Sequence, residues 1–206
     1  MTTTFDQLCT KHFCDKGNWA HRYSPHYEWL LEPFKDKPIR LLEIGVGDGK
    51  SIRVWLEYFT HPHVQIIGVD KDPVMTSYDR FTFVQADQTS PLALQALLDG
   101  PYDIIIDDGC HNTQGIMTSF ETLWPFVKPG GFYVIEDLRC SYMPGYEIPG
   151  WPSQMYFIKQ LLDDINSQTN YKPAPDTVCN YPNGTDSGRR IDWLRFSEEL
   201  AIIKKK

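Results

Sequence analysis

The chain has 206 residues, of which 41% are hydrophobic and 14% aromatic, and its formal net charge at pH 7 is −7. This length and apolar content predict one domain with a full hydrophobic core. The negative charge argues against a broad surface for nucleic acid or anionic lipid, which would need clustered lysine and arginine. We therefore expect neither nucleic acid nor a membrane as a partner.

The N-terminal stretch MTTTFDQLCTKH has no apolar core of the kind found in signal peptides. No apolar run approaches the roughly 20 residues of a membrane span. The cysteines are odd in number and lack the paired spacing of zinc sites; they are Cys9, Cys14, Cys110, Cys140 and Cys179. We therefore expect a cytoplasmic protein with reduced thiols.

Strand-like and helix-like segments alternate through the middle of the chain, which predicts a sheet built from β-α-β units. Strands are expected at 39–46, 64–70, 81–87, 102–108 and 132–137, with helices at 50–59, 90–98 and 113–127 between them. Helices are also expected at 24–34, before the sheet, and at 155–167, after it. The segment 191–204 is expected to close the chain as a hairpin.

The first strand leads into EIGVGDGKS, in which Glu43, Gly45, Gly47 and Gly49 alternate with other residues. Glycines at a strand-to-helix turn let the backbone turn tightly and let a ligand approach the helix N-terminus. The spacing is neither GxGxxG nor GxxxxGK[ST], although Ser51 stands where the second motif ends. Any α/β protein needs glycine at such a turn, so the turn alone leaves the ligand open.

The next two strands end in acids, at Asp70 and Asp87. An acid at the end of the second strand is typical of one that accepts hydrogen bonds from ribose hydroxyls. Taken singly, Asp87 could equally cap a turn. Together with the glycine turn, the two acids predict a nucleoside site along one edge of the sheet.

Two acidic pairs follow, Asp107 with Asp108 and Glu136 with Asp137. Neighbouring residues of a strand point to opposite faces, so one acid of a pair can face a cofactor and the other a substrate pocket. Carboxylates crowded at one edge repel one another, unless they are partly protonated or a divalent cation lies among them. Oxygen ligands favour Mg²⁺, with Mn²⁺ or Ca²⁺ possible, and the alternative is that the acids cap turns.

His111 follows Asp108 after a turn that contains Gly109. An imidazole that titrates near neutrality is a suitable base for a hydroxyl whose pKa a metal lowers. A lone histidine is more often structural, but the acidic surroundings of His111 favour a catalytic role.

The pattern ExGxGxG, followed by VD and AD, resembles the class I S-adenosylmethionine-dependent methyltransferases in order and spacing. The longer segments DKGNWAHRYSPHYEWLLEPF, DIIIDDGCHNTQGIMTSFETLWPFVKPGGFYVIEDL and SYMPGY resemble the macrocin and mycinamicin group of metal-dependent sugar O-methyltransferases. The resemblance implies an α/β fold with a Rossmann-like seven-strand methyltransferase sheet, mostly parallel with an antiparallel C-terminal strand, and helices on both faces.

The same resemblance implies S-adenosyl-L-methionine and Mg²⁺ as cofactors and a homodimer or higher homo-oligomer. The acceptor would be a sugar hydroxyl of a glycoside, a polysaccharide or a glycosylated natural product. It also implies a single methyltransferase domain over 1–206. This domain would comprise an N-terminal helical cap at 1–38, a cofactor-binding core at 39–137 and substrate loops at 138–154 and 181–190.

Residue roles are implied position by position. The cofactor would contact Glu43, Gly45, Gly47, Ser51, Asp70, Asp87 and Asp107. The metal ligands would be Asp108, Glu136 and Asp137, with His111 as the general base. Aromatic side chains are expected either to bind the substrate or to pack in the ordinary way; they are Tyr23, Tyr142, Tyr146 and Trp151.

Other functions remain open from the sequence. A phenol or catechol methyltransferase would use the same site with a flatter, more apolar pocket. A non-catalytic protein that binds the cofactor as a scaffold would not need such costly acids. A hydrolase or nuclease that uses the metal alone would not need the nucleoside-binding acids.

Overall fold

The computed structural model describes residues 3–74, 77–167 and 190–206. One sheet has the strand order β3-β2-β1-β4-β5-β7-β6. The strands are β1 (Arg40–Ile44), β2 (Gln65–Asp70), β3 (Phe81–Gln85), β4 (Tyr102–Asp107), β5 (Val127–Ile135), β6 (Ile191–Ser197) and β7 (Leu200–Lys205). Strands β1 to β5 pair in parallel, while β7 runs antiparallel to both β5 and β6. The predicted seven-strand α/β fold is therefore confirmed.

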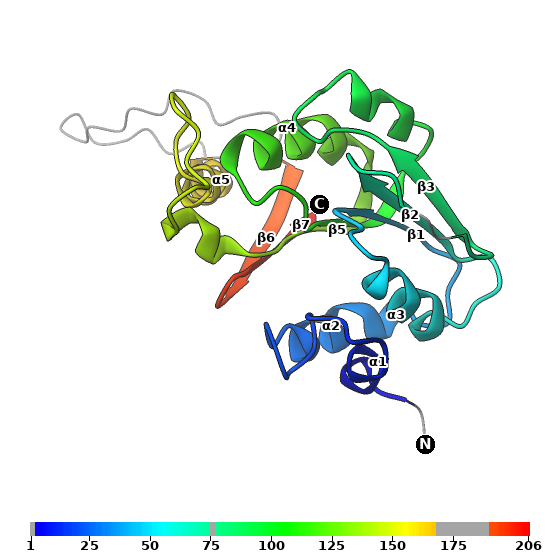
Figure 1. Ribbon diagram of the computed structural model, residues 1–206. Coiled ribbons are helices and arrows are strands. Elements are labelled where there is room, and N and C mark those ends of the chain that lie inside the picture. The colour runs from blue at the N-terminus through cyan, green and yellow to red at the C-terminus, as the bar shows by residue number, and fades with distance from the viewer. Residues whose placement is uncertain (1–2, 75–76, 168–189) are drawn as a thin grey trace.

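Helices cover both faces of the sheet, with α1, α2 and α3 on one face and α4 and α5 on the other (Figure 1). The α-helices are α1 (Phe5–His12), α2 (Ser24–Leu31), α3 (Lys50–Tyr58), α4 (Thr113–Leu123) and α5 (Gln154–Ser167). The 3-10 helices are η1 (Glu32–Phe34), η2 (Ala93–Leu97), η3 (Trp124–Phe126) and η4 (Leu138–Tyr142). Among the described residues, no helix is both long and apolar enough to cross a membrane.

The alternation of side chains along β4 determines the position of the acids that follow it. Ile104 and Ile106 pack into the core on the side of α1, α2 and α3, whereas Ile105 packs into the core on the side of α4 and α5. Because this alternation has a period of two, Asp107 falls on the α4 side and Asp108 on the α1 side.

Three helix predictions were too long. The helix expected at 24–34 ends at Leu31, and η1, which contains Pro33, follows it. The helix expected at 90–98 is only the short η2, because Gly100 and Pro101 end the segment before a second α-helical turn can form. The helix expected at 113–127 ends at Leu123, and η3, which contains Pro125, follows it.

The start of β5 and the whole of α1 were not predicted. Strand β5 begins at Val127, which pairs with Tyr102, and an irregular register separates this pair from the rest of the strand. The sequence KPGG therefore lies within the strand and not before it. Helix α1 begins with a capping box in which Thr4 and Gln7 exchange hydrogen bonds, a signal that the sequence does contain.

Candidate functional site

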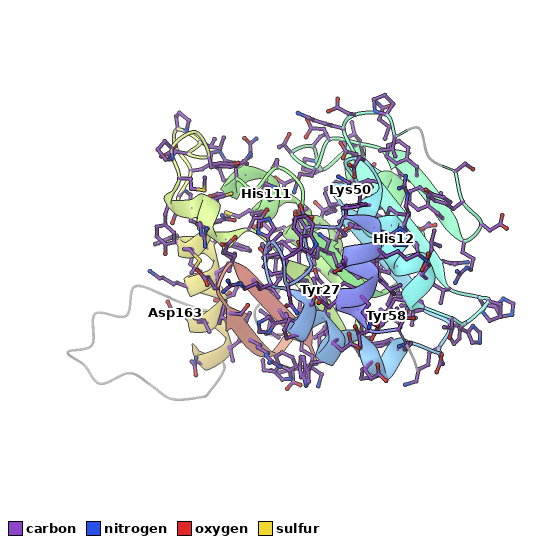
Figure 2. The ribbon with its side chains drawn as sticks, turned by 60° about the horizontal axis from the view of Figure 1, so that its bottom comes forward. His12, Tyr27, Lys50, Tyr58, His111 and Asp163 are labelled. Carbon is purple, nitrogen blue, oxygen red and sulfur yellow. The ribbon has the colours of Figure 1, made fainter. Side chains whose placement is uncertain are left out.

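A cavity of about 490 Å³ opens at the carboxyl ends of β1, β2 and β4. Its lining includes the glycine turn, Asp70, Asp108, His111 and Asp137. Figure 2 shows His111 and Lys50 on the same side of the molecule, and both residues line this cavity. In open α/β sheets ligands bind at this edge, so four of the predicted site residues, Asp70, Asp108, His111 and Asp137, gather where a ligand is expected.

A second cavity of about 180 Å³ lies next to the first and shares Gly45, Asp70 and Gly109 with it. Its walls include apolar side chains of Val69 and Ala86. A ligand with an apolar, flat end and a polar end could therefore extend from the larger cavity into the smaller one.

The glycine turn brings the backbone of β1 against the backbone that follows β4. Gly45 has a φ of +88°, and a Cβ built on it would lie 2.0 Å from the carbonyl oxygen of Asp108. Gly47 has a φ of +53° and would have no atom within 4 Å of its Cβ. Its N–H donates to Oδ2 of Asp70 at 2.9 Å, which fixes that carboxylate at the mouth of the cavity.

Asp87 lines the smaller cavity and also caps a turn. Its Oδ1 accepts hydrogen bonds from the N–H of Thr89 at 2.8 Å and from the Thr89 hydroxyl at 2.7 Å. These bonds hold the pKa of Asp87 below its usual value, so the group stays ionised. The interpretation of Asp87 as a turn cap is therefore confirmed, and its contact with a nucleoside stays a prediction.

Asp107, which was expected to contact the cofactor, faces neither of the two cavities. It is buried, and it is absent from the lining of both cavities. Its carboxylate accepts hydrogen bonds from Ser119 of α4, from Tyr133 at 3.0 Å and from Gln88 at 3.0 Å. The period of the strand turns Asp107 toward α4, where it joins the sheet to the helix layer.

Replacing Asp107 with alanine is expected to lower the free energy of unfolding by about 3 to 5 kcal/mol. The loss follows because Ser119, Tyr133 and Gln88 would lose their shared charged acceptor in the interior and keep only neutral ones, the Ser119 hydroxyl and two backbone carbonyls of α4. Chemical denaturation measures the effect. Asp163→Ala, at an exposed position of α5 (Figure 2), should change the same free energy by less than about 0.5 kcal/mol. Equal stability of the two variants would contradict this role of Asp107.

Glu43, also expected to contact the cofactor, likewise lines neither of the two cavities. It is fully buried beneath the glycine turn and accepts hydrogen bonds from the Ser51 hydroxyl at 2.7 Å and the Trp55 indole at 3.0 Å. Burial raises the pKa of Glu43 to about 7. Ser51 does line the larger cavity, but its hydroxyl is directed to Glu43, so Glu43 and Ser51 together anchor α3 to β1.

Lys16, which sequence reasoning missed, lies among the predicted acids. It is 1% exposed, and its Nζ contacts Asp108, Oε2 of Glu136 at 2.8 Å and Oε1 of Glu43 at 3.6 Å. Burial alone would lower the pKa of Lys16, but the three carboxylates raise it well above its usual value. The ammonium of Lys16 therefore lies inside the acidic cluster, where it pairs with three carboxylates.

Two tyrosines that precede or belong to α2 hold the second acidic pair. The hydroxyl of Tyr23 donates to Oδ1 of Asp137 at 2.7 Å, and the hydroxyl of Tyr27 donates to Oε1 of Glu136. Tyr23 is 1% exposed, so the expectation that it binds the substrate is not supported. Its structural contacts give it the role of fixing Asp137.

Ligand atoms of Asp108, His111 and Asp137 all lie within 4.8 Å of one another. His111 and Asp137 both have left-handed backbone conformations, with φ of 51° and 57°, which are uncommon outside glycine and concentrate at functional sites. Nε2 of His111 is 3.5 Å from Oδ2 of Asp137. Two carboxylates at one open position suit Mg²⁺, which binds through one or two carboxylates and completes its shell with water or substrate oxygens.

The expected third ligand, Glu136, is not part of that group. Both of its carboxylate oxygens are already bonded, one to Lys16 and the other to Tyr27. In this arrangement the predicted ligand set is therefore divided, with Asp108 and Asp137 at the cavity and Glu136 buried behind them.

A third cavity, of about 80 Å³, adjoins the acidic cluster through His111. Tyr146 and Trp151 line it, and the ring of Tyr146 lies 6.4 Å from that of His111. Tyr142 is 74% exposed and does not line it, so that expectation is not supported. The second expected substrate loop, 181–190, lies outside the described residues except for Arg190.

The chain is similar to methyltransferases in sequence and in structure. The family model described as Methyltransferase domain matches residues 42–138. A tetracenomycin rhamnosyl 2'-O-methyltransferase of Streptomyces olivaceus is 35% identical over 97% of this chain and 54% of its own length. Mycinamicin VI 2''-O-methyltransferase of Micromonospora griseorubida is also 35% identical, over 97% of this chain and 52% of its own length.

The solved structure of the MycE methyltransferase from the mycinamycin biosynthetic pathway, in complex with Mg and SAH, superimposes with a TM-score of 0.86. It is 31% identical and covers 100% of this chain and 55% of its own. The chain thus spans about half the length of the curated relatives that it matches. The chain therefore contains a methyltransferase domain, and the resemblance of its motifs to the macrocin and mycinamicin group of class I S-adenosylmethionine-dependent methyltransferases is confirmed.

Proposed function

We propose that the protein transfers a methyl group from S-adenosyl-L-methionine to a sugar hydroxyl of a glycoside, with the help of Mg²⁺. One observation carries the proposal, namely that two adjacent cavities bring two groups of acids together. Asp70 and Asp87 lie at one side of these cavities, and the cluster of Asp108, His111 and Asp137 lies at the other. A nucleoside and an activated hydroxyl can therefore meet at one point.

The cavities suit the parts of the cofactor. The carboxylate of Asp70 is oriented by the N–H of Gly47 and retains acceptor capacity for ribose hydroxyls. Val69, Ala86 and Asp87 surround the smaller cavity, whose volume suits a base. Gly45 and Gly47 line the larger cavity without side chains, which allows close approach of the methionine part.

The acidic cluster supports the chemical step. When bound, the sulfonium cofactor supplies the methyl group, and a divalent ion supplies positive charge beside the acceptor hydroxyl. Asp108 and Asp137 would hold that ion, since their carboxylates lie at the open cavity. His111 would take the proton from the hydroxyl at Nε2, because this nitrogen lies 3.5 Å from Oδ2 of Asp137 and its side chain lines the cavity beside the two acids.

The acceptor would lie over His111. Tyr146 and Trp151 line the adjoining cavity, where their rings could stack on a sugar face. The relatives support a glycoside: one acts on a rhamnosyl tetracenomycin, and a MycE structure contains mycinamycin VI together with Mg and SAH. We include polysaccharides and other glycosylated natural products in the proposed acceptor class.

The N-terminal residues of the single domain would act as a cap that completes the site, since Lys16, Tyr23 and Tyr27 all bond acids of the sheet. We also propose that the protein forms a homodimer or higher homo-oligomer and binds neither nucleic acid nor membrane. Sedimentation equilibrium tests the first of these statements, and a single species with the mass of one chain would refute it.

The function is tested by calorimetric binding of S-adenosylhomocysteine and by methyl transfer to 8-demethyl-8-α-L-rhamnosyl tetracenomycin C and to catechol, each with Mg²⁺ or EDTA. The proposal expects nucleoside binding and Mg²⁺-dependent methylation of the glycoside in preference to catechol. Absence of nucleoside binding would refute it, and a preference for catechol would favour the phenol alternative.

Replacing Asp70 with asparagine is expected to weaken binding of S-adenosylhomocysteine about tenfold to a hundredfold, because hydrogen bonds to a charged acceptor are stronger than those to an amide. Calorimetric titration measures the dissociation constant. Asp72→Asn is the matched control, since Asp72 is exposed and lines neither cavity. If both variants bind the nucleoside like the wild type, Asp70 does not contact the ribose.

A further inference from the structure

The third cavity, of about 80 Å³, is lined by two side chains whose polar atoms have no role so far. These side chains are Gln154 and Ser141. Oε1 of Gln154 and Oγ of Ser141 are buried, and neither has a hydrogen-bond partner among the residues that the structure describes. Buried polar atoms in native proteins are nearly always hydrogen-bonded. Two unpaired atoms beside one cavity therefore indicate a ligand that supplies the missing bonds.

The backbone fixes the orientation of the Gln154 amide. Gln154 is the first residue of α5 and is 1% exposed. Its Nε2 donates to the carbonyl oxygens of Asp137 and Leu138, each at 3.3 Å. Carbonyl oxygens can only accept, so the amide nitrogen must face them and Oε1 must point away from them. Gln154 therefore presents a fixed acceptor, and its missing partner has to be a donor.

The position of the third cavity indicates where this donor comes from. His111 lines both this cavity and the larger one, so a group that enters it lies beside the proposed base. The rings of Tyr146 and Trp151 belong to the same lining and suit the face of a sugar. The cavity is far smaller than the roughly 300 to 1,000 Å³ of pockets that enclose a whole ligand. Only one edge of a sugar ring can therefore occupy it, and the donors on such an edge are hydroxyl groups.

We propose that Gln154 is a specificity-determining residue: its Oε1 accepts a hydrogen bond from a second hydroxyl of the acceptor sugar, one that is not methylated. This inference rests on the acceptor part of the proposed function. It narrows the acceptor class to sugars on which this second hydroxyl is free. A deoxy position there would leave Oε1 buried without a donor, and sites built to bond a hydroxyl reject analogues that lack it.

The experiment compares the wild type with Gln154→Met on 8-demethyl-8-α-L-rhamnosyl tetracenomycin C and on its analogues in which each sugar hydroxyl in turn is replaced by hydrogen. Acceptor binding is titrated calorimetrically with S-adenosylhomocysteine and Mg²⁺ present, and kcat/KM is measured with S-adenosylmethionine. The analogue without the methylated hydroxyl gives no product. Among the others, we expect one to lose about tenfold or more in wild-type binding and in kcat/KM.

Gln154→Met should bind the parent glycoside about tenfold more weakly and should no longer distinguish it from that analogue by more than about threefold. The variant also loses the bonds to the carbonyls of Asp137 and Leu138. This structural loss acts on every acceptor alike, so it cancels when two acceptors are compared. Equal losses on the parent and on all analogues would show a structural role alone and overturn the inference.

Gln95→Met is the matched control, because Gln95 is exposed on η2 and lines none of the three cavities. It should keep the wild-type preference among the acceptors within about threefold. If Gln154→Met does not fold, the wild type decides. Binding of every analogue that keeps the methylated hydroxyl within about threefold of the parent would overturn the inference.

Failure of the proposed function is recognised separately. If the wild type neither binds nor methylates the parent glycoside, the acceptor class of the proposed function fails, and the inference fails with it. If the wild type methylates the parent glycoside but treats the remaining analogues alike, the proposed function stands and the role of Gln154 fails. Binding of S-adenosylhomocysteine tests the nucleoside part of the function independently of Gln154.

Discussion

Replacing His111 with asparagine is expected to lower kcat for methyl transfer to a glycoside about 10²- to 10⁴-fold, the usual contribution of a general base. Asparagine has no basic nitrogen, but it tolerates the left-handed backbone that His111 adopts with a φ of 51°. The variant therefore removes the proposed proton acceptor with little strain. A second variant, His111→Ala, should show a similar loss of kcat with a larger loss of stability.

The proposed role separates catalysis from binding. His111 lines both the larger cavity and the smaller pocket of Tyr146, on the side where the acceptor is proposed to bind. Its loss should therefore leave the dissociation constant of S-adenosylhomocysteine within about threefold of the wild-type value. Steady-state kinetics and calorimetry measure the two quantities. His63→Ala, at an exposed position between α3 and β2, should match the wild type in both. Wild-type turnover of His111→Asn on an unactivated sugar would refute the assignment of the base.

Local patterns were sufficient to predict the sheet and to place Asp70, Asp108 and Asp137 at one edge of it. The run of isoleucines in β4 and the period of a strand place Asp107 and Asp108 on opposite faces. Position along a strand thus predicted that the two acids lie on opposite faces of the sheet, but it did not predict which side chains donate hydrogen bonds to them.

The contacts of Lys16 with the acids could not be predicted, because this lysine comes from a segment without helical or strand periodicity. Lys16 lies in an irregular stretch after α1, and its contacts with Asp108 and Glu136 join residues 92 and 120 positions apart. Tyr23 is recognisable from the sequence only as an aromatic residue, yet its hydroxyl donates a hydrogen bond to Asp137, 114 positions away. Such contacts depend on how the N-terminal helices dock, which no local motif specifies.

The conformation of the glycine turn leads to a second large effect. Gly45→Ala is expected to lower the free energy of unfolding by about 3 kcal/mol or more and to abolish binding of S-adenosylhomocysteine at micromolar concentrations. The added Cβ would lie 2.0 Å from the carbonyl oxygen of Asp108 and 2.8 Å from the Cα of Gly109. Both are backbone atoms, so the segment that carries Asp108 would have to move.

Gly47→Ala is the matched comparison, because Gly47 also has a positive φ but its Cβ would meet no atom within 4 Å. We expect a loss of only about 1 to 2 kcal/mol in stability, the cost of a left-handed conformation for an L-residue. Chemical denaturation of both variants measures the loss of stability caused by backbone strain. Calorimetric titration measures how far the added methyl group hinders binding of S-adenosylhomocysteine in the cavity. If Gly45→Ala were as stable as Gly47→Ala, the backbone of Gly45 would not lie against that of Asp108 in solution. The proposed nucleoside site and the proposed metal site would then not be held next to each other by this contact.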